Sequence, residues 1–343
     1  MRNTILTVTL LLAAGCTGAE ATAPAAAPEG TEETVATTSA RLSASDPALG
    51  LTADFRAFLA ANPTYAAFDF ARGDLDGASS YGGRVTAGDA VTHQPIVFVH
   101  GNADRGVGGS YGGWNASIDA ARAQGYGPQE IYAFTWGDAD VALTAYQYHS
   151  EENLKRVRTF FQAVLAYTGA AKIDVVAHSM GVTLARKAIL GGAANDALGD
   201  GSYNLGASLG SQVDTFLGIS GANVGLTSCW YTGPSTPTCG ATNGFYPGTS
   251  NGFTVVGRSA FLNDLLPRRG EAAYVASMWS SGDEILGPGA LVWGVNTARV
   301  PGQNGERQLA SSCGHFASKN GTAAAQLAIV TTHQPSTAPS GCP

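Results

Sequence analysis

Charged side chains are scarce in this chain, and basic residues form no cluster. Lys, Arg, Asp and Glu together make up 13% of the 343 residues, and the formal net charge is −7 at pH 7. A protein that binds nucleic acid needs a basic patch to neutralise phosphates, so this composition excludes nucleic acid as a partner. Glycine, in contrast, is abundant, with 45 residues. Low charge and many glycines fit an exported protein that is rich in loops.

The apolar run near the N-terminus is too short to cross a bilayer. It covers residues 5–14, whereas a spanning helix needs about 20 apolar residues. Because it follows the positive Arg2, it predicts a signal peptide over residues 1–15. The next residue completes an Ala-Ala-Gly-Cys sequence that resembles a bacterial lipobox, which makes Cys16 the predicted lipidation site. Ordinary secretory cleavage nearby is the alternative; either route places the protein outside the cytoplasm, lipid-anchored to a bacterial membrane or secreted.

Large apolar residues are nearly absent from the segment that follows. Residues 16–45 consist mostly of Ala, Thr, Pro, Glu and Ser. Such a segment cannot bury enough surface to fold, and it predicts a flexible linker. The remaining residues, 46–343, have a length and an apolar content that fit one large catalytic domain. We expect this domain to be a monomer.

The chain has no C-x-x-C motif and no cluster of histidines. This absence argues against a metal site, and we expect no metal and no other cofactor. Four cysteines remain beside Cys16, and an even number in an exported chain favours disulfides. Cys229 and Cys239 flank a turn rich in Gly and Pro and form the most natural local pair. Cys313 and Cys342 would then fasten the C-terminus, although four cysteines allow three pairings.

Short apolar runs alternate with amphipathic segments along the domain. Residues 96–99 are all apolar strand formers, which is typical of a strand buried on both faces of a parallel sheet. The alternation predicts an α/β fold: a mostly parallel, doubly wound sheet with helices on both faces and with loop insertions. Strands are predicted at residues 96–99, 131–136, 215–219 and 273–279, and one more begins at residue 173. Helices are predicted at 52–61, 116–124, 258–266 and 323–330; one more begins at residue 150, and another runs through residues 184–189. Residues 191–212 are predicted to form a surface insertion.

One strand ends abruptly at a serine between small residues. The apolar run that starts at Ile173 leads into Ala177-His178-Ser179-Met180-Gly181, and a helical pattern follows. This is the setting of a nucleophile elbow, in which a strained turn lifts the serine hydroxyl above the edge of the sheet. An ordinary strand-to-helix turn is the alternative. The carboxyl ends of other strands carry site-forming residues as well, and parallel sheets place their chemistry there. We therefore predict that Ser179 is a nucleophile.

A serine nucleophile needs an imidazole base and a carboxylate that orients it. In enzymes with this elbow the acid and then the histidine follow the serine along the chain. Asp283 follows the predicted strand 273–279 and is the first choice for the acid, ahead of Glu284 and Asp264. His315 precedes the last predicted helix and is the predicted base; His333 lies in a polar tail. The other histidines have structural roles available, His178 as part of the elbow and His93 and His149 as core or surface residues.

Two backbone N–H groups are expected to bind the oxyanion of the tetrahedral intermediate. One belongs to Met180, which directly follows the nucleophile, and the other to Asn102, in the loop after strand 96–99. Because both donors belong to the main chain, substitution of the Asn102 side chain reports on the second donor only indirectly.

These motifs together resemble the class 2 bacterial lipases of the α/β-hydrolase fold. Within that group they are most similar to the extracellular depolymerase of native, amorphous polyhydroxybutyrate. The resemblance implies Ser179, Asp283 and His315 as nucleophile, acid and base, with Asn102 and Met180 at the oxyanion hole. It is carried by residues 97–102, 148–150, 167–169, 174–182 and 314–316, and the likeness to the depolymerase continues through 228–233 and 237–240.

Aromatic residues gather in the stretch 229–253. Trp230, Tyr231, Phe245 and Tyr246 are predicted to present an apolar surface to a lipid droplet or a polyester. The alternative is that these rings cover the core beneath a long loop. We expect a serine carboxylic-ester hydrolase, a lipase or esterase that forms an acyl-enzyme. Polyester depolymerisation is the second hypothesis, and a non-catalytic surface-binding lipoprotein is the third.

Overall fold

The computed structural model describes residues 50–75, 77–267 and 270–342. The predicted signal peptide 1–15, the linker 16–45 and the lipidation site Cys16 lie outside the described residues. Within the described ranges, no helix combines the length and the apolar character that a membrane span requires.

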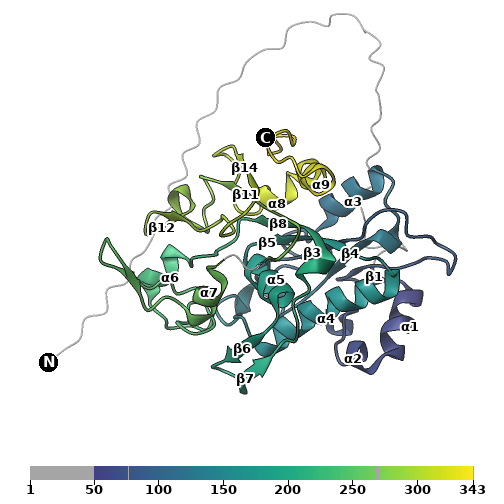
Figure 1. Cartoon of the computed structure of the whole chain (residues 1–343), viewed down its shortest axis with the longest axis horizontal. Coiled ribbons are helices and arrows are strands. Elements are labelled where there is room, and N and C mark those ends of the chain that lie inside the picture. The colour runs from purple at the N-terminus through teal and green to yellow at the C-terminus, as the bar shows by residue number, and fades with distance from the viewer. Residues whose placement is uncertain (1–49, 76, 268–269, 343) are drawn as a thin grey trace, which may run out of the picture. The chain divides into compact units, whose positions relative to one another are not determined.

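One large sheet forms the centre of the described residues. It has eight strands in the order β1-β2-β4-β3-β5-β8-β11-β14, and β4, β3, β5, β8, β11 and β14 all run parallel (Figure 1). Only the pairing of β2 with β4 is antiparallel in this sheet. The strands are β1 (Gly50–Leu51), β2 (Tyr81–Gly82), β3 (Ile96–Val99), β4 (Ile131–Phe134), β5 (Ile173–His178), β8 (Val213–Ile219), β11 (Tyr274–Ser280) and β14 (Gly305–Leu309).

Helices cover both faces of this sheet. One layer contains α3, α8 and α9, and the other contains α1, α2, α4, α5 and α7 (Figure 1). The helices are α1 (Ala53–Ala61), α2 (Pro63–Ala66), α3 (Asn115–Ala123), α4 (Glu151–Thr168), α5 (Met180–Leu190), α6 (Thr227–Thr232), α7 (Ala260–Leu265), α8 (Ala317–Asn320) and α9 (Ala323–Thr332). This three-layer arrangement is the α/β-hydrolase fold that the sequence predicts.

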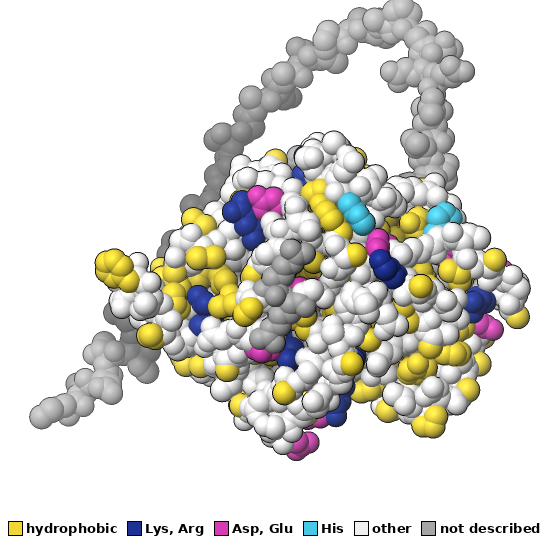
Figure 2. Space-filling model, in the orientation of Figure 1, with side chains coloured by type: hydrophobic (Ala, Val, Ile, Leu, Met, Phe, Trp, Pro, Cys, Tyr) yellow, Lys and Arg dark blue, Asp and Glu magenta, His cyan; other side chains and the backbone are white. Residues whose placement is uncertain are grey.

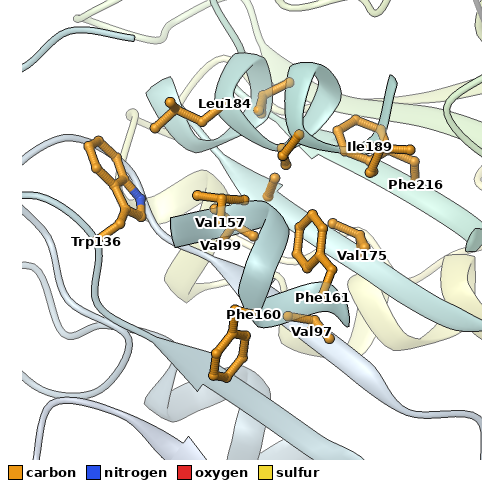
Figure 3. Packing of buried hydrophobic residues seen from close by; sticks show 14 of the residues in the cluster. Val97, Val99, Trp136, Val157, Phe160, Phe161, Val175, Leu184, Ile189 and Phe216 are labelled. Carbon is orange, nitrogen blue, oxygen red and sulfur yellow. The ribbon is translucent and has the colours of Figure 1, made fainter. Parts of the chain in front are cut away.

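Alternate residues of each central strand enter two separate cores. In β3, Val97 and Val99 join the cluster that contains the aromatic rings of α1 and α4, while Ile96 and Phe98 join the cluster under α3 and α9. All four side chains are fully buried. Figure 3 shows the first cluster, where Phe160 and Phe161 of α4 pack near Val97 and Val175. A strand buried on both faces explains why the apolar run 96–99 has no polar alternation.

The longest helix has both of its ends specified by the sequence. The Ser150 side chain accepts a hydrogen bond from the Asn153 N–H at the first turn, and Glu151 and Glu152 lie at the positive end of the helix dipole. The helix ends at Gly169, whose φ of 70° is left-handed. These signals place α4 where the pattern starting at residue 150 predicts it.

The insertions between the main elements contain short hairpins. The segment 191–212, predicted as a surface insertion, folds into an antiparallel pair of strands. Two further pairs occupy the long connections that precede α7 and β14. The hairpins are β6 (Ala193–Asp196) with β7 (Gly201–Asn204), β9 (Thr249–Ser250) with β10 (Val255–Val256), and β12 (Leu291–Val292) with β13 (Val295–Asn296).

Candidate active site

Ser179 lies on a strained turn between β5 and α5. Its φ of 54° and ψ of −127° are unusual for a residue with a side chain, and such a conformation costs about 1–3 kcal/mol. The Ser179 N–H donates to the Ile219 carbonyl at the end of β8, at 2.9 Å, which fixes the turn to the neighbouring strand. Ser179 is half-buried, whereas His178 and Met180 on either side are buried. This geometry is that of a nucleophile elbow.

Two glycines allow other backbone to approach this turn closely. A Cβ built on Gly181 would collide with the carbonyl oxygens of Val99 and His100. A Cβ on Gly101 would lie 2.8 Å from the Cβ of Ser179. The loop after β3 therefore packs directly against the serine, which brings the Asn102 backbone to the elbow.

The Asp283 carboxylate and the His315 imidazole lie in direct contact. Nδ1 of His315 is 2.8 Å from one carboxylate oxygen and 2.9 Å from the other. Because a carboxylate only accepts, the proton is on Nδ1, and Nε2 carries the free lone pair. Asp283 follows β11 and His315 follows β14, so the two reach the same edge of the sheet as Ser179. The structure thus brings together the acid and the base that the sequence predicts.

The environment of Asp283 keeps its carboxylate ionised. Burial would raise its pKa, but hydrogen bonding to His315 and the Leu286 N–H outweighs burial and holds the pKa below the ordinary value of 3.8. The N–H groups of Ile285 and Leu286 both donate to one carboxylate oxygen, at 3.0 and 2.9 Å. A permanent negative charge therefore faces the imidazole.

Two neighbouring side chains hold the backbone of His315. Glu284, a weaker sequence candidate for the acid, accepts the His315 N–H at 2.9 Å and so lies against the main chain of the base. The ring of His178 donates from Nε2 to the His315 carbonyl at 3.1 Å, and the two rings are 4.6 Å apart. Burial, and then repulsion from His315, keeps the pKa of His178 well below its ordinary value, so His178 is neutral.

Ser179 and His315 share this edge without a hydrogen bond between them in the described structure. His178, which directly precedes Ser179, contacts His315 through both its ring and its Nε2. Hydrogen bonds between catalytic groups are often long without substrate and tighten in the reacting complex.

The expected oxyanion donors are next to the elbow in the chain or in space: Met180 follows Ser179, and Asn102 follows Gly101, which packs against the serine. Met180 is the first residue of α5, where backbone N–H groups have no partner within the helix, and no side chain caps this end. Across residues 50–75, 77–267 and 270–342, neither the Met180 N–H nor the Asn102 N–H has a hydrogen-bond partner. Both groups are available to a developing negative charge.

A buried histidine supports the loop that carries Asn102. The Trp136 N–H donates to Nε2 of His100 at 3.0 Å, so the His100 proton is on Nδ1, which lies 2.6 Å from the Gly101 carbonyl. Burial lowers the pKa of His100 to about 4 and keeps the ring neutral. The Trp136 indole N–H donates to the His100 carbonyl at 2.9 Å, and the indole ring stacks on the His100 ring.

A buried ion pair joins the same loop to the helix after His315. The Lys319 ammonium in α8 lies 2.5 Å from Asp104 and 2.6 Å from the Gly113 carbonyl. Burial lowers the pKa of Lys319, and the charge of Asp104 counteracts this effect. The rings of Tyr111 and Phe316 stack beside this pair, 4.0 Å apart. The loop after β3, which carries Asn102, and the segment that carries His315 are therefore packed together.

The remaining sequence candidates for acid and base lie elsewhere. Asp264 is on α7, where it forms an ion pair with Lys187 at 2.9 Å. His333 ends α9, stacks on Tyr274 and bonds to Thr215 at 2.9 Å. Thr215 belongs to the amino half of β8, so His333 is remote from the edge that carries His315.

The four cysteines that the structure describes form two disulfides, Cys229 with Cys239 and Cys313 with Cys342. The second joins the C-terminal tail to the segment two residues before His315. In the part of the chain that is described, no three His, Cys, Asp or Glu side chains are placed to hold a metal ion.

The aromatic stretch divides between core and surface. Phe245, predicted to contact substrate, is only 2% exposed and packs on the ring of His149; this prediction is corrected, because the ring is part of the core. Tyr246 is half-buried. Trp230 and Tyr231 are 38% and 77% exposed, and they remain available to a ligand.

Several residues of the site escaped the sequence analysis. Asp104 and Lys319 act through packing and hydrogen bonds rather than through a motif. The same holds for the backbone contacts of His100 and Glu284, although the sequence analysis did place these two residues near the site. One feature of the sequence could have pointed to Asp104: it is a charged residue within a glycine-rich loop. Long-range partners such as Lys319 cannot be assigned to Asp104 without the fold.

Among solved structures, this chain is similar to several hydrolases. Lipase B of Aspergillus fumigatus is 14% identical, with a TM-score of 0.47 over 77% of this chain and 57% of that lipase. A truncated carbohydrate esterase from gut microbiota is 12% identical, with a TM-score of 0.45 over 75% of this chain and 90% of the esterase. An α/β hydrolase from a lagoon sediment metagenome in Morocco is 11% identical, with a TM-score of 0.37 over 71% and 86% of the two chains. This chain thus spans little more than half of the Aspergillus lipase.

The parallel sheet with its serine elbow defines an α/β hydrolase. The sequence model of the lipase (class 2) family matches residues 93–328, more than half of the chain. The chain belongs to the class 2 lipase family, whose members hydrolyse esters.

Proposed function

We propose that this protein is a serine carboxylic-ester hydrolase that works through an acyl-enzyme. The observation that carries the proposal is the contact of His315 Nδ1 with both Asp283 oxygens, beside the elbow of Ser179. An imidazole with its proton fixed on Nδ1 has Nε2 free to accept the proton of a serine hydroxyl.

In the first half of the reaction, Ser179 Oγ attacks the ester carbonyl carbon and His315 Nε2 takes the hydroxyl proton. Asp283 stabilises the imidazolium that forms. The carbonyl oxygen becomes negative and accepts hydrogen bonds from the N–H groups of Asn102 and Met180. The intermediate then collapses, and the alcohol leaves with the proton from His315. In the second half, a water molecule loses a proton to His315 and attacks the acyl-enzyme. The second intermediate collapses, the acid is released, and His315 returns the proton to Ser179 Oγ.

An exposed apolar surface beside the site supports an apolar substrate. It comprises Ile285, two residues after Asp283, and exposed side chains of the hairpin β12–β13 and of α6. The hairpin and α6 are joined, since the Thr227 hydroxyl donates to the Leu291 carbonyl at 3.2 Å. Figure 2 shows hydrophobic side chains gathered where Figure 1 places α6 and β12. The exposed members are Trp230, Tyr231, Ile285, Leu291 and Val295.

Acylglycerols are the first substrate class, and polyesters are the second. Either presents ester bonds within an apolar phase that this surface would contact. The second class is favoured by the resemblance of residues 228–233 and 237–240 to the depolymerase of native polyhydroxybutyrate. A non-catalytic lipoprotein that only binds such surfaces is the competing reading.

Export and lipid anchoring at Cys16 belong to the same proposal. The signal-like residues 1–15 and the two disulfides support an extracytoplasmic location. Mass spectrometry of the protein from its host should find diacylglycerol and an acyl chain on Cys16. A chain that begins at another residue and carries no lipid would indicate plain secretion. The protein should elute as a monomer in size-exclusion chromatography.

The test of the enzyme proposal is hydrolysis by the purified protein. We expect p-nitrophenyl butyrate to be hydrolysed, and Ser179→Ala or His315→Ala to lower kcat by about 10⁴-fold or more. Parallel assays with tributyrin and amorphous polyhydroxybutyrate would identify the substrate class. No hydrolysis of any ester by the folded protein would favour the surface-binding lipoprotein.

A further inference from the structure

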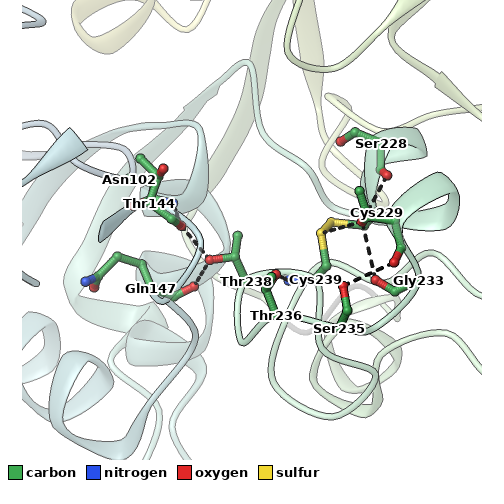
Figure 4. Close-up of a disulfide and its surroundings, with 11 residues drawn as sticks. Asn102, Thr144, Gln147, Ser228, Cys229, Gly233, Ser235, Thr236, Thr238 and Cys239 are labelled. Atoms are coloured by element: carbon green, nitrogen blue, oxygen red, sulfur yellow. Dashed lines mark hydrogen bonds between the residues drawn. A yellow bond between two sulfur atoms is a disulfide. The ribbon is translucent and has the colours of Figure 1, made fainter. Parts of the chain in front are cut away.

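The side chain of Asn102 does not face the oxyanion site but is bound to a neighbouring loop. Its Nδ2 donates to the Thr144 carbonyl at 2.8 Å. The same carbonyl accepts the hydroxyl of Thr238 at 2.6 Å. In Figure 4, Thr144 lies between Asn102 and Thr238, and the Cys229–Cys239 disulfide lies beyond Thr238. One carbonyl thus connects a proposed oxyanion residue to a cross-linked loop.

The turn that carries Asn102 needs support from outside. Ala103, the next residue, has a φ of 59°, which is strained for a residue with a side chain. The turn is closed by the Asp104 N–H, which donates to the Gly101 carbonyl at 3.3 Å. A strained turn of this kind persists only where its surroundings fix it, and a small rotation would redirect the Asn102 N–H.

Thr238 is well placed to supply that support. Its N–H donates to the Ala145 carbonyl at 3.2 Å, and its one hydroxyl proton is shared between the Thr144 and Gln147 carbonyls. The Thr238 carbonyl accepts the N–H of the buried Phe245 at 2.7 Å. The adjacent Cys239 is cross-linked to Cys229 in α6. The Thr238 backbone is therefore fixed through its N–H, its carbonyl and the neighbouring disulfide. Its hydroxyl bonds the Thr144 carbonyl, to which the Asn102 side chain is also bonded.

We propose that Thr238 is a positioning residue for the oxyanion hole. It holds the Thr144 carbonyl in place, and this carbonyl, through the Asn102 side chain, aims the Asn102 N–H at the substrate oxygen. The inference rests on the proposed esterase function. It adds a role for the disulfide loop 229–239 in turnover, beyond its stability.

Thr238→Val is the central variant, because it keeps the shape of the side chain and removes the hydroxyl. We expect kcat for p-nitrophenyl butyrate to fall about tenfold, with KM changed less than twofold. Loss of a whole oxyanion donor costs about 10²–10³-fold, and a donor that is only misaligned should cost less. Thr238→Ser, which restores the hydroxyl, should recover most of the activity. Circular dichroism and thermal unfolding establish that each variant is folded.

A double-mutant cycle separates positioning from general loosening of the loop. Asn102→Ala removes the other bond to the same carbonyl, so adding Thr238→Val to it should lower kcat little further. Thr236→Val is the matched control, since Thr236 lies in the same loop and its hydroxyl accepts the Cys239 N–H, at 3.3 Å, and bonds no other group among the described residues. It should leave kcat unchanged.

Unchanged kcat in Thr238→Val, multiplicative losses in the double variant, or an equal loss in Thr236→Val would each overturn the positioning role. If Thr238→Val does not fold, Asn102→Ala alone decides, because unchanged kcat there removes the proposed connection. Failure of the esterase proposal looks different: hydrolysis would be absent from the parent protein or would persist in Ser179→Ala.

Discussion

Three histidines meet near Ser179, and their hydrogen bonds assign a different task to each. His100 and His178 are buried and neutral, because burial lowers the pKa of His100 to about 4 and that of His178 well below its usual range. Such rings accept protons poorly at neutral pH and serve here as fixed hydrogen-bond partners of backbone carbonyls. His315 alone of the three contacts a carboxylate, which fixes its proton on Nδ1. His315 is therefore the ring that we propose as the general base.

Replacement of the acid should separate orientation from structure. In Asp283→Asn the side-chain amide would donate to Nδ1, so the His315 proton would move to Nε2 and the ring could no longer accept the Ser179 proton. We expect kcat to fall by about 10³–10⁴-fold, with the fold retained. Initial rates with p-nitrophenyl butyrate, together with circular dichroism, provide the measurement.

Glu284→Gln is the matched control for this replacement. Its side chain would still accept the His315 N–H through the amide oxygen, so kcat should fall less than about tenfold. A larger loss in Glu284→Gln than in Asp283→Asn would mean that Glu284 is the catalytic acid.

At the scale of elements, the central strands and most helices follow from local pattern. Apolar strands such as 96–99 and capped helices such as α4 are specified by their own residues. The edge strand β14, Gly-Glu-Arg-Gln-Leu, was not predicted, because its half-exposed residues have no apolar alternation and it forms only beside β11. The same difference applies to the candidate site. Ser179 and His315 can be predicted from sequence motifs, whereas Thr238 and Lys319 act only through contacts that the fold creates.

The contact of α5 with β3 depends on a glycine. Gly181→Ala would place a Cβ against the carbonyls of Val99 and His100, both in buried backbone. We expect a loss of about 1–3 kcal/mol in the free energy of unfolding and a lower kcat, because the elbow must shift. Urea titration and steady-state kinetics measure the two effects.

Gly88→Ala is the control, since its Cβ would meet no atom within 4 Å and its backbone is unstrained. This variant should match the parent in both measurements. A fully stable and active Gly181→Ala would show that the elbow does not pack on β3 as described.

At the scale of the whole molecule, buried neutral histidines make stability depend on pH. Burial lowers the pKa of His149 to about 3 and that of His100 to about 4, from 6.5. Each histidine takes up a proton more readily in the unfolded chain, so its contribution to stability is complete above pH 6.5 and is lost as the pH falls toward its folded pKa. At about pH 4.5 each should remove roughly 3 kcal/mol from the free energy of unfolding.

Urea titrations between about pH 7.5 and pH 4.5 measure this effect, and His149→Gln provides the comparison. The variant starts less stable, because its bonds to Asn243 and Thr183 are altered, but it should lose less stability on acidification than the parent. Equal losses in the two proteins would contradict the assignment of His149 as a buried neutral group.

The central claim is that Ser179 is a nucleophile activated by its fold, and covalent labelling tests it most directly. The folded protein should react with a fluorophosphonate, and mass spectrometry of the digested adduct should place the label on Ser179. Urea-unfolded protein and the His315→Ala variant should react little, since an ordinary serine hydroxyl is a weak nucleophile. A folded, native protein with no label on Ser179, or with the label on another serine, would contradict the account.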